Sequence, residues 1–469
     1  MTGWSTERVS TETSGPSTDS EIGRRTLRRV AWRLMPLLGL LYFVNYLDRV
    51  NIGFAGPNGM NAELGLTATV FGLASGIFFI GYLLLEVPSN LALHRFGARR
   101  WITRILVSWG IIASIMAFTP NATVLIVLRF LLGVAEAGFF PGIILYLTFW
   151  FPAEYRARAV GWFMVAVPVS TAVGSTVSAL IIQGGEGLFG LSGWRVMFLA
   201  EGIPAIVLGI VTFFALTDRP EQARWLAEDE RSWLRRRLDA ETAEVEAAEH
   251  WPLRRALTAP RILVLAFVYF GVTYGLYALG FFLPTIVSGF EQQFGTKLDT
   301  IEKGLVTSVP YVVAAVGMVV WSRLADRSAS RADGSGFLAG EGGRRWWLAL
   351  PMIVGGIAIP IALYLRDPFS AMVAVTICAV GTCAALPTFW PLPSQFLTGA
   401  AAAGGIALIN SLGNLSGFVA PYVTGGLADL TGSQRAGLWV VGIVTVAGAV
   451  AALLVGRRTS RSAVRDPSG

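Results

Sequence analysis

Long apolar runs, separated by short polar segments, are the feature of this sequence that most limits its fold. A helix that crosses a bilayer needs about twenty consecutive, mainly apolar residues. The sequence therefore predicts an all-α membrane protein, with transmembrane helices near residues 31–55, 68–92, 101–119, 122–147, 158–183, 195–216, 262–289, 304–322, 346–365, 369–396, 402–427 and 436–456.

The composition supports this fold class and argues against several functions. Only 14% of the residues are charged, whereas about 25% is usual in soluble domains. The net charge of +7 does not indicate nucleic-acid binding, because the basic residues lie between the apolar runs and form no stripe with aromatic residues. Cys378 and Cys383 lie in one apolar run and are interpreted as small core residues. Neither a nucleophile–base set nor metal-ligand spacing is visible, so we expect neither an enzyme nor a bound cofactor.

A charged segment at 218–261 divides the twelve predicted helices into two sets of six. Short similar motifs follow the second helix of each set, at 90–100 and 322–327, and two repeated halves are typical of transporters. The predicted domains are a polar cytoplasmic tail at 1–28, a six-helix bundle at 29–217, a cytoplasmic linker at 218–261 that includes an amphipathic surface helix, a second bundle at 262–457, and a cytoplasmic tail at 458–469.

The distribution of basic residues predicts the orientation in the membrane. Loops that face the cytoplasm carry an excess of Lys and Arg. With the N-terminus inside, the cytoplasmic segments hold most of the arginines, and the opposite side holds only Lys297, Lys303, Arg366, Arg435 and Arg195. We therefore expect a multi-pass protein of the inner (plasma) membrane with both termini in the cytoplasm.

Four charged residues lie inside two of the apolar runs: Asp48 and Arg49 in the first, and Arg129 and Glu136 in the fourth. Such groups cost several kcal/mol at membrane depth, so they usually have a function or a partner. Arg129 and Glu136 are two helical turns apart and share one face, which should look into the protein. Asp48 and Arg49 are adjacent in sequence and should point in different directions.

These charges suggest a binding site for an organic anion. The planar guanidinium of Arg49 can hold a carboxylate with two parallel hydrogen bonds. A carboxylate buried away from water can carry a proton at neutral pH, which makes Asp48 and Glu136 candidate proton carriers. Alternatively, the four charges form salt bridges that only hold helices together. Glu86 and Glu201, which also lie within apolar runs, are interpreted as structural.

At these residues the chain resembles a known family. Over about residues 25–457 it is similar to the anion:cation symporter family of the major facilitator superfamily, which includes bacterial organic-acid permeases for galactonate, tartrate, phthalate and hydroxyphenylacetate. The segments that carry the resemblance are Tyr46–Ala55, Gly81–Asn90, Arg129–Gly142, Trp150–Pro152, Leu216–Glu221 and Asn410–Phe418.

The resemblance implies the major facilitator fold, in which two six-helix bundles rock about a central site. It implies that Asp48 and Glu136 serve proton coupling and that Arg49 contacts the substrate carboxylate. Further positions that match substrate contacts of the family are Tyr46, Tyr82, Arg129, Trp390 and Asn410.

Two positions depart from the family pattern. His94 stands where the loop after the second helix normally carries Asp, and it is interpreted as a tolerated substitution or a pH-sensitive gate residue. Val167 stands where sugar-acid permeases have Gln, which favours an aromatic or less hydroxylated acid.

The predicted function is the import of a small organic carboxylate, an aromatic acid or a sugar acid, by proton symport with alternating access. Protons are the coupling ions, the lipid bilayer surrounds the protein, no nucleic acid is bound, and a monomer is expected. One alternative is an anion exchanger or uniporter without proton coupling. Another is a membrane sensor in a transporter-like fold, although the tails are too short for a signalling domain.

Overall fold

The computed structural model describes residues 17–247, 259–329, 340–394 and 399–455. Within these ranges the secondary structure is helical and no strand occurs. Twelve helices are long and apolar enough to cross a membrane, which confirms the predicted fold class. The predicted tail at 458–469 and parts of the predicted linker and N-terminal tail lie outside the described residues.

Six spans form the first half of the chain. Several are divided into shorter helices, and a short 3-10 turn precedes the sixth. In chain order the elements are α1 (Ser17–Val50), α2 (Ile52–Ala55), η1 (Gly56–Met60), α3 (Asn61–Glu63), α4 (Ala68–Phe96), α5 (Ala98–Ile115), η2 (Met116–Phe118), α6 (Ala122–Glu136), α7 (Phe139–Thr148), α8 (Ala153–Gly185), η3 (Leu188–Gly190) and α9 (Gly193–Ala215).

The linker and the second half follow. The linker contains η4 (Pro220–Gln222) and α10 (Glu228–Ala247), in the segment where the sequence predicts a surface helix. The second half consists of α12 (Pro260–Ser288), α13 (Phe290–Phe294), α14 (Thr300–Ala329), α15 (Gly340–Ala362), α16 (Pro368–Phe389), α17 (Pro391–Ser394), α18 (Gly399–Asn414), α19 (Ser416–Thr431) and α20 (Arg435–Val455).

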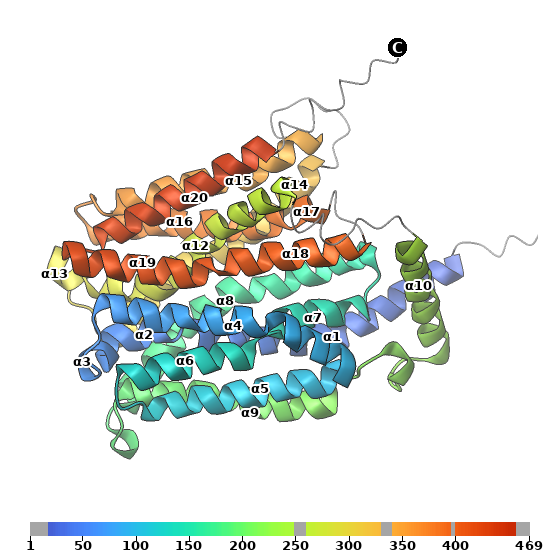
Figure 1. Ribbon diagram of the computed structural model, residues 1–469, viewed down its shortest axis with the longest axis horizontal. Helices are drawn as coiled ribbons and strands as arrows, with labels where there is room; N and C mark the ends of the chain where they lie inside the picture. The colour runs from blue at the N-terminus through green and yellow to red at the C-terminus, as the bar shows by residue number, and fades with distance from the viewer. Residues whose placement is uncertain (1–16, 248–258, 330–339, 395–398, 456–469) are drawn as a thin grey trace, which may run out of the picture.

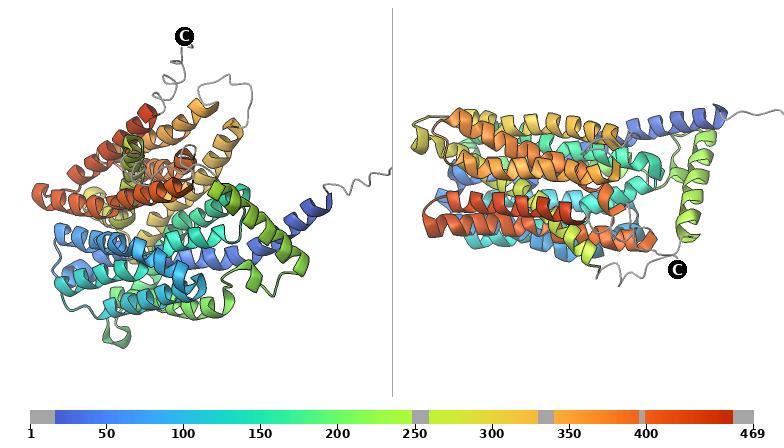
Figure 2. Two further views of the ribbon diagram at one scale, coloured as in Figure 1. Left: turned by 45° about the vertical axis from the view of Figure 1, so that its right-hand side comes forward. Right: turned by 90° about the horizontal axis from the view of Figure 1, so that it is seen from above.

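The two halves lie side by side with their long helices roughly parallel (Figures 1 and 2). α10 crosses one end of the bundle, next to the start of α1. We call this the linker end. The opposite end, where α3 and α13 lie, is called the far end.

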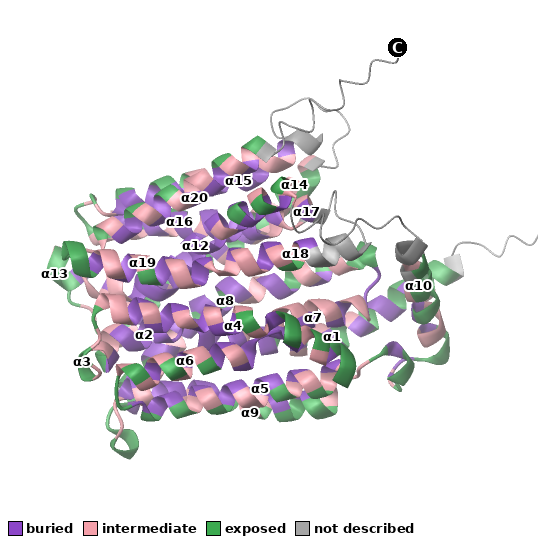
Figure 3. Ribbon diagram, viewed as in Figure 1, coloured by how far each residue is buried: buried purple, intermediate pink, exposed green. Residues whose placement is uncertain are grey.

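Apolar side chains cover much of the outer surface of the bundle. Phe214 is 79% exposed and Val316 is 61% exposed, which would be unfavourable in water but suits contact with lipid chains. Buried residues are concentrated where helices face one another, as along α12 in the middle of the bundle (Figure 3). α12 is thus an inner helix, whereas α14 presents a wide face to the surroundings.

Three spans are interrupted close to polar residues. The first is interrupted at Asn51, the fourth at Ala137 and Gly138, and the eleventh at Leu415. Gly138 has a φ of +83°, and a Cβ there would lie 2.3 Å from the hydroxyl oxygen of Ser89. Only glycine fits both this conformation and this approach. Irregular backbone at membrane depth is tolerated only inside protein, so each interruption marks a buried polar region.

Polar side chains cap several spans outside their apolar parts. Asp367 precedes α16 and accepts hydrogen bonds from the hydroxyl of Ser370 at 2.6 Å and from its backbone N–H at 2.8 Å. These bonds lower the pKa of the Asp367 carboxyl below its ordinary value. The start of this span is therefore fixed locally by the sequence.

At the far end, α4 of the first half packs closely against α19 of the second. The Asp429 carboxylate accepts hydrogen bonds from the backbone N–H groups of Ala68 at 3.1 Å and Thr69 at 2.7 Å. A Cβ at Gly72 would lie 2.2 Å from the carbonyl oxygen of Pro421. The two helices therefore touch backbone to backbone.

A second far-end contact joins α8 to α14. A Cβ at Gly304 would lie 2.5 Å from the Cβ of Ala179, and the Gln183 side chain accepts a hydrogen bond of 3.3 Å from the N–H of Ile301. Among the described residues, α16 and α18 touch the first half much less than α14 and α19 do. The structure is thus closed between the halves at the far end.

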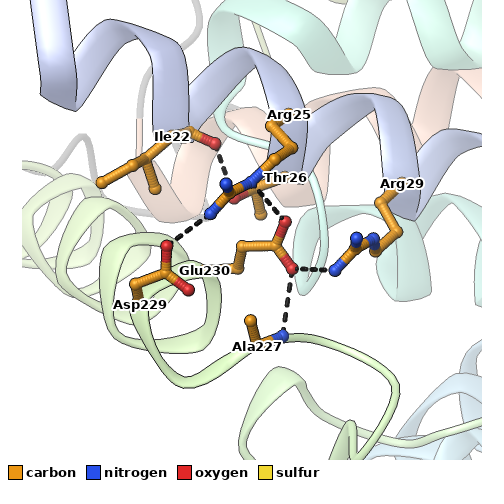
Figure 4. Close-up of polar contacts among 7 residues, drawn as sticks. All are labelled: Ile22, Arg25, Thr26, Arg29, Ala227, Asp229 and Glu230. Carbon is orange, nitrogen blue, oxygen red and sulfur yellow. Dashed lines mark hydrogen bonds and ion pairs between the residues drawn. The ribbon is translucent and has the colours of Figure 1, made fainter.

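The linker helix is bound to the first half through a buried carboxylate. Glu230 of α10 is fully buried. It accepts hydrogen bonds from Arg25 Nε at 3.0 Å, from Arg29 Nη1 at 2.6 Å and from the N–H of Ala227 at 3.0 Å (Figure 4). Asp229 also pairs with Arg25. These contacts hold the polar N-terminal part of α1, which lies inside the segment predicted as a polar tail, against the linker helix.

A second set of contacts holds α10 and the preceding loop on the same half. The Glu241 carboxylate accepts hydrogen bonds from Arg156 at 2.8 Å and from the N–H of Ala153 at 2.9 Å. The ring of Trp225 stacks on that of Trp150, with centroids 5.5 Å apart. The described part of the linker therefore belongs structurally to the first half.

Replacing Glu230 by alanine should release α10 from α1. Arg25 and Arg29 are about half exposed, so solvent weakens the pairs and we expect a loss of only about 1 kcal/mol of local docking free energy. Hydrogen exchange of the first turns of α1 should become faster by several fold. Glu228→Ala is the matched control, because the Glu228 side chain is 81% exposed and pairs within α10. Equal exchange in both variants would contradict this assignment.

Candidate substrate-binding site

A small cavity lies between the two halves. Both halves contribute side chains to its wall, and aromatic rings are prominent among them. The lining residues are Tyr42, Tyr46, Arg49, Tyr82, Phe140, Met164 and Val167 from the first half, and Tyr269, Thr273, Leu276, Tyr277, Leu386, Asn410 and Asn414 from the second.

Arg49 is the charged residue in this wall. Its guanidinium carbon lies 5.1 Å from the ring centre of Phe78, 5.4 Å from that of Tyr82 and 6.0 Å from that of Tyr46. The faces of aromatic rings attract cations, so these rings hold the guanidinium in place. A cation that is 6% exposed at the wall of an aromatic cavity is well suited to bind an anion.

Glu136 of α6 is the ion-pair partner of Arg49. Arg49 Nη2 donates to Glu136 Oε2 at 3.0 Å, and the amide of Asn45 donates to the same oxygen at 2.8 Å. Glu136 Oε1 and Arg49 Nε are buried and make no hydrogen bond within the described part of the chain. The pair is therefore joined by one bond and not by a bidentate fork, which leaves the arginine with capacity for a second carboxylate.

Arg129 lies behind the cavity and not in its wall. Its guanidinium donates to the backbone carbonyls of Ala74 at 3.3 Å, Arg49 at 3.3 Å and Ser75 at 3.4 Å. Both Arg129 and Glu136 are fully buried, as their shared helix face predicts. Arg129 links α1, α4 and α6, and its predicted contact with substrate stays a prediction.

Asp48 points away from the cavity. Its carboxylate accepts a hydrogen bond of 2.6 Å from the indole nitrogen of Trp109 on α5 and a longer one, 3.5 Å, from the amide of Asn51. Asp48 and Arg49 therefore point in different directions, as expected. The two predicted proton carriers, Asp48 and Glu136, occupy separate polar clusters.

The second half contributes neutral polar groups. The Thr273 hydroxyl donates to the carbonyl of Gly413 at 3.0 Å and accepts from the Ser416 hydroxyl at 2.8 Å. The Tyr277 hydroxyl donates to the side-chain oxygen of Asn414 at 3.3 Å. Charge on the first half thus faces hydroxyl and amide groups on the second.

Glu86 of α4 connects the halves beside the cavity. Its two carboxylate oxygens accept hydrogen bonds from the amide of Asn410 at 2.7 Å and from the hydroxyl of Ser411 at 3.0 Å. Asn410 is one of the residues that line the cavity. The sequence suggests a structural role for Glu86. In the structure, its side chain joins the two halves next to the candidate site.

Three tyrosines in the cavity wall were not predicted from the sequence: Tyr42, Tyr269 and Tyr277. Tyr42 lies one helical turn before Tyr46, so the 3.6-residue spacing could have identified it. Trp390, which was predicted, does not itself line the cavity. Its ring lies 5.0 Å from that of Tyr269, which does.

Residues 38–421 match the family model described as the Major Facilitator Superfamily, and a second match covers residues 296–469. The chain belongs to the major facilitator superfamily. The predicted superfamily and the expectation of a non-enzymatic transporter are thereby confirmed.

Individual relatives match nearly the whole chain. A candidate tartrate transporter of Agrobacterium vitis is 45% identical over 94% of each chain. A quinolone resistance transporter of Acinetobacter baumannii is 39% identical, over 93% of this chain and 96% of its own. A solved structure of a bacterial homologue of the human lysosomal transporter Spinster, inward-facing and unoccupied, has a TM-score of 0.68 at 16% identity, over 93% of this chain and 98% of its own. The last likeness shows the fold alone.

Proposed function

We propose that this transporter imports a small organic carboxylate together with protons across the bacterial inner membrane. The observation that supports this most is the position of Arg49. It is a buried cation in an aromatic cavity between two halves, and its ion-pair partner is a buried carboxylate, Glu136. An arginine in this setting can exchange one carboxylate partner for another.

Competition for Arg49 provides the proposed coupling. Ionised Glu136 holds the guanidinium, whereas a proton on Glu136 removes the charge that attracts it. Arg49 is then free to bind the substrate carboxylate. The buried pair favours this exchange, because a charge left without a partner in the protein interior is strongly unfavourable. Proton and anion therefore enter the site together.

Alternating access follows from the arrangement of the halves. We place both termini and the linker end in the cytoplasm, on the basis of the arginine distribution. The far end then faces outward, and the structure is closed on that side. Rocking would separate α4 from α19 and α8 from α14, and would open the site to the outside.

The cavity wall guides the choice of substrates. Val167 lines the cavity at the position where sugar-acid permeases have Gln, and aromatic rings surround Arg49. These features favour an aromatic or less hydroxylated acid, whereas the similarity to a candidate tartrate transporter favours a hydroxylated dicarboxylate. A thermal-shift screen of purified protein against aromatic acids, sugar acids and dicarboxylates separates the two, because a ligand that binds only the folded state raises its Tm.

Glu136→Gln should separate transport from coupling. In proteoliposomes, the variant should still exchange labelled for unlabelled substrate, because Arg49 and its aromatic contacts remain. It should no longer accumulate substrate in response to a pH gradient, because a glutamine at this position cannot carry a proton. The matched control is Glu63→Gln, which changes an exposed carboxylate at the far end. Gradient-driven accumulation by Glu136→Gln would remove Glu136 from the coupling mechanism, and a wild type that also ignores the gradient would favour an exchanger or uniporter.

A further inference from the structure

A second pair of carboxylates lies within the first half, apart from the cavity. Asn51 Nδ2 donates to Glu201 Oε2 at 3.0 Å and lies 3.5 Å from Asp48 Oδ1, so one amide nitrogen bridges the two acids. The Ser178 hydroxyl donates to Glu201 Oε1 at 2.7 Å. The four side chains come from α1, α8, α9 and the interruption after α1, and none is more than 2% exposed.

Within the described part of the chain, no cation is paired with this cluster, because neither Asp48 nor Glu201 forms an ion pair there. From α5 the group that faces Asp48 is the neutral indole of Trp109. From α6, the positive charge of Arg129 also acts on Asp48, although its guanidinium donates to backbone carbonyls and not to the Asp48 carboxylate.

Among the described residues, the other charged groups near the cluster also leave its two carboxylates without an ion-pair partner. Glu136 of α6 adds a further negative charge, and Arg49 points to Glu136 and the cavity. Two ionised carboxylates that share an amide bridge in a dry interior repel each other and lack solvation. A single proton shared between them removes one charge and adds one hydrogen-bond donor.

The cluster is close in sequence to two contacts between the halves. Asn51 is two residues before Gly53, where a Cβ would lie 2.9 Å from the carbonyl oxygen of Gly280 on α12. Ser178 is next to Ala179, which packs against Gly304 of α14. The cluster is therefore joined through the chain to segments that contact α12 and α14 of the second half.

We propose that Asp48 and Glu201, bridged by Asn51, form a proton-binding site that holds one shared proton while the far end is closed. This site is separate from the Glu136–Arg49 pair. The presence of the proton rests on the geometry of the cluster alone, whereas its use in transport rests on the proposed symport. Glu201 is then a proton-binding residue and not only a structural one.

Infrared spectroscopy of the full-length protein in lipid tests this site without any substrate, because a protonated carboxylic acid has a C=O stretching band that an ionised carboxylate lacks. The difference spectrum between wild type and the double variant Asp48→Asn/Glu201→Gln should contain one such band. Glu63→Gln, which changes a carboxylate paired with Arg195, is the matched control and should leave the band in place.

A double variant that keeps the full band of the wild type overturns the proposal. Should the double variant fail to fold, Ser178→Ala replaces it: loss of the Ser178 hydrogen bond should shift the band, and an unchanged band overturns the proposal. A wild type with this band but without proton-driven uptake would refute the proposed symport and leave the proton site standing. If the wild type shows proton-driven uptake but the double variant keeps the band, the proposed symport stands and the proton site is refuted.

Discussion

Replacing Arg49 by alanine is expected to lower kcat/KM for carboxylate uptake on the order of 100-fold or more. Removing one partner of a buried, hydrogen-bonded charge pair usually costs about 2–5 kcal/mol, and each 1.4 kcal/mol is about tenfold. Arg49→Lys should not restore uptake, because an ammonium group keeps the charge but lacks the planar fork. Initial rates in proteoliposomes, with the acid that the thermal-shift screen identifies, measure this effect.

The same substitution also leaves Glu136 buried without its cation, so a loss of stability must be separated from a loss of binding. Arg49→Ala/Glu136→Gln removes the unpaired charge and should recover much of the lost Tm, but not the uptake. Glu136→Gln alone should keep substrate binding. Near-normal uptake by Arg49→Ala would show that the anion binds elsewhere.

Replacing Gly72 by alanine is expected to hold the far end open and to reduce uptake on the order of tenfold or more. The new Cβ would lie 2.2 Å from the carbonyl oxygen of Pro421 and 2.8 Å from its carbonyl carbon. Both are backbone atoms, so the clash is relieved only if α4 and α19 move apart. Overpacking costs about 1–3 kcal/mol, and this cost falls only on the state in which the far end is closed.

Gly161→Ala is the matched control, because a Cβ at Gly161 of α8 would meet no atom within 4 Å. A cysteine introduced at Val167, in the cavity wall, reports the state of the far end through an impermeant thiol reagent applied from that side. The native Cys378 and Cys383 are buried, so they should react little. Gly72→Ala should speed the reaction and Gly161→Ala should not. Equal labelling and equal uptake in both variants would contradict the assigned contact.

The positions of the spans and their inner charges could be predicted because they depend on local pattern. The twelve apolar runs, the shared face of Arg129 and Glu136, and the different directions of Asp48 and Arg49 all follow from hydropathy and helical spacing. Cys378 and Cys383 are buried in the core, as their place in one apolar run indicates.

The partners of these charges could not be predicted in the same way. Glu86 meets Asn410 across 324 residues of sequence, and Asn51 meets Glu201 across 150. Such contacts depend on how the helices pack, which no local pattern determines.

The points where helices begin or are interrupted could not be predicted from local pattern either. The N-terminal part of α1 is polar and was predicted as a tail, and it is helical where its arginines meet the acidic side of α10. At the interruption at Gly138, a Cβ would lie 2.3 Å from the hydroxyl oxygen of Ser89, which belongs to another span, so the close approach of that span requires glycine. In both places a tertiary contact decides the local structure.

Proton movement during substrate uptake tests the central claim most directly. Proteoliposomes that contain a trapped pH indicator, with equal pH on both sides, receive the identified carboxylate from outside while its uptake is counted. Proton symport predicts that the interior becomes acidic as the substrate enters, and that Glu136→Gln shows no acidification. Uptake by the wild type without any change in internal pH would contradict the account and would identify the protein as a uniporter or exchanger.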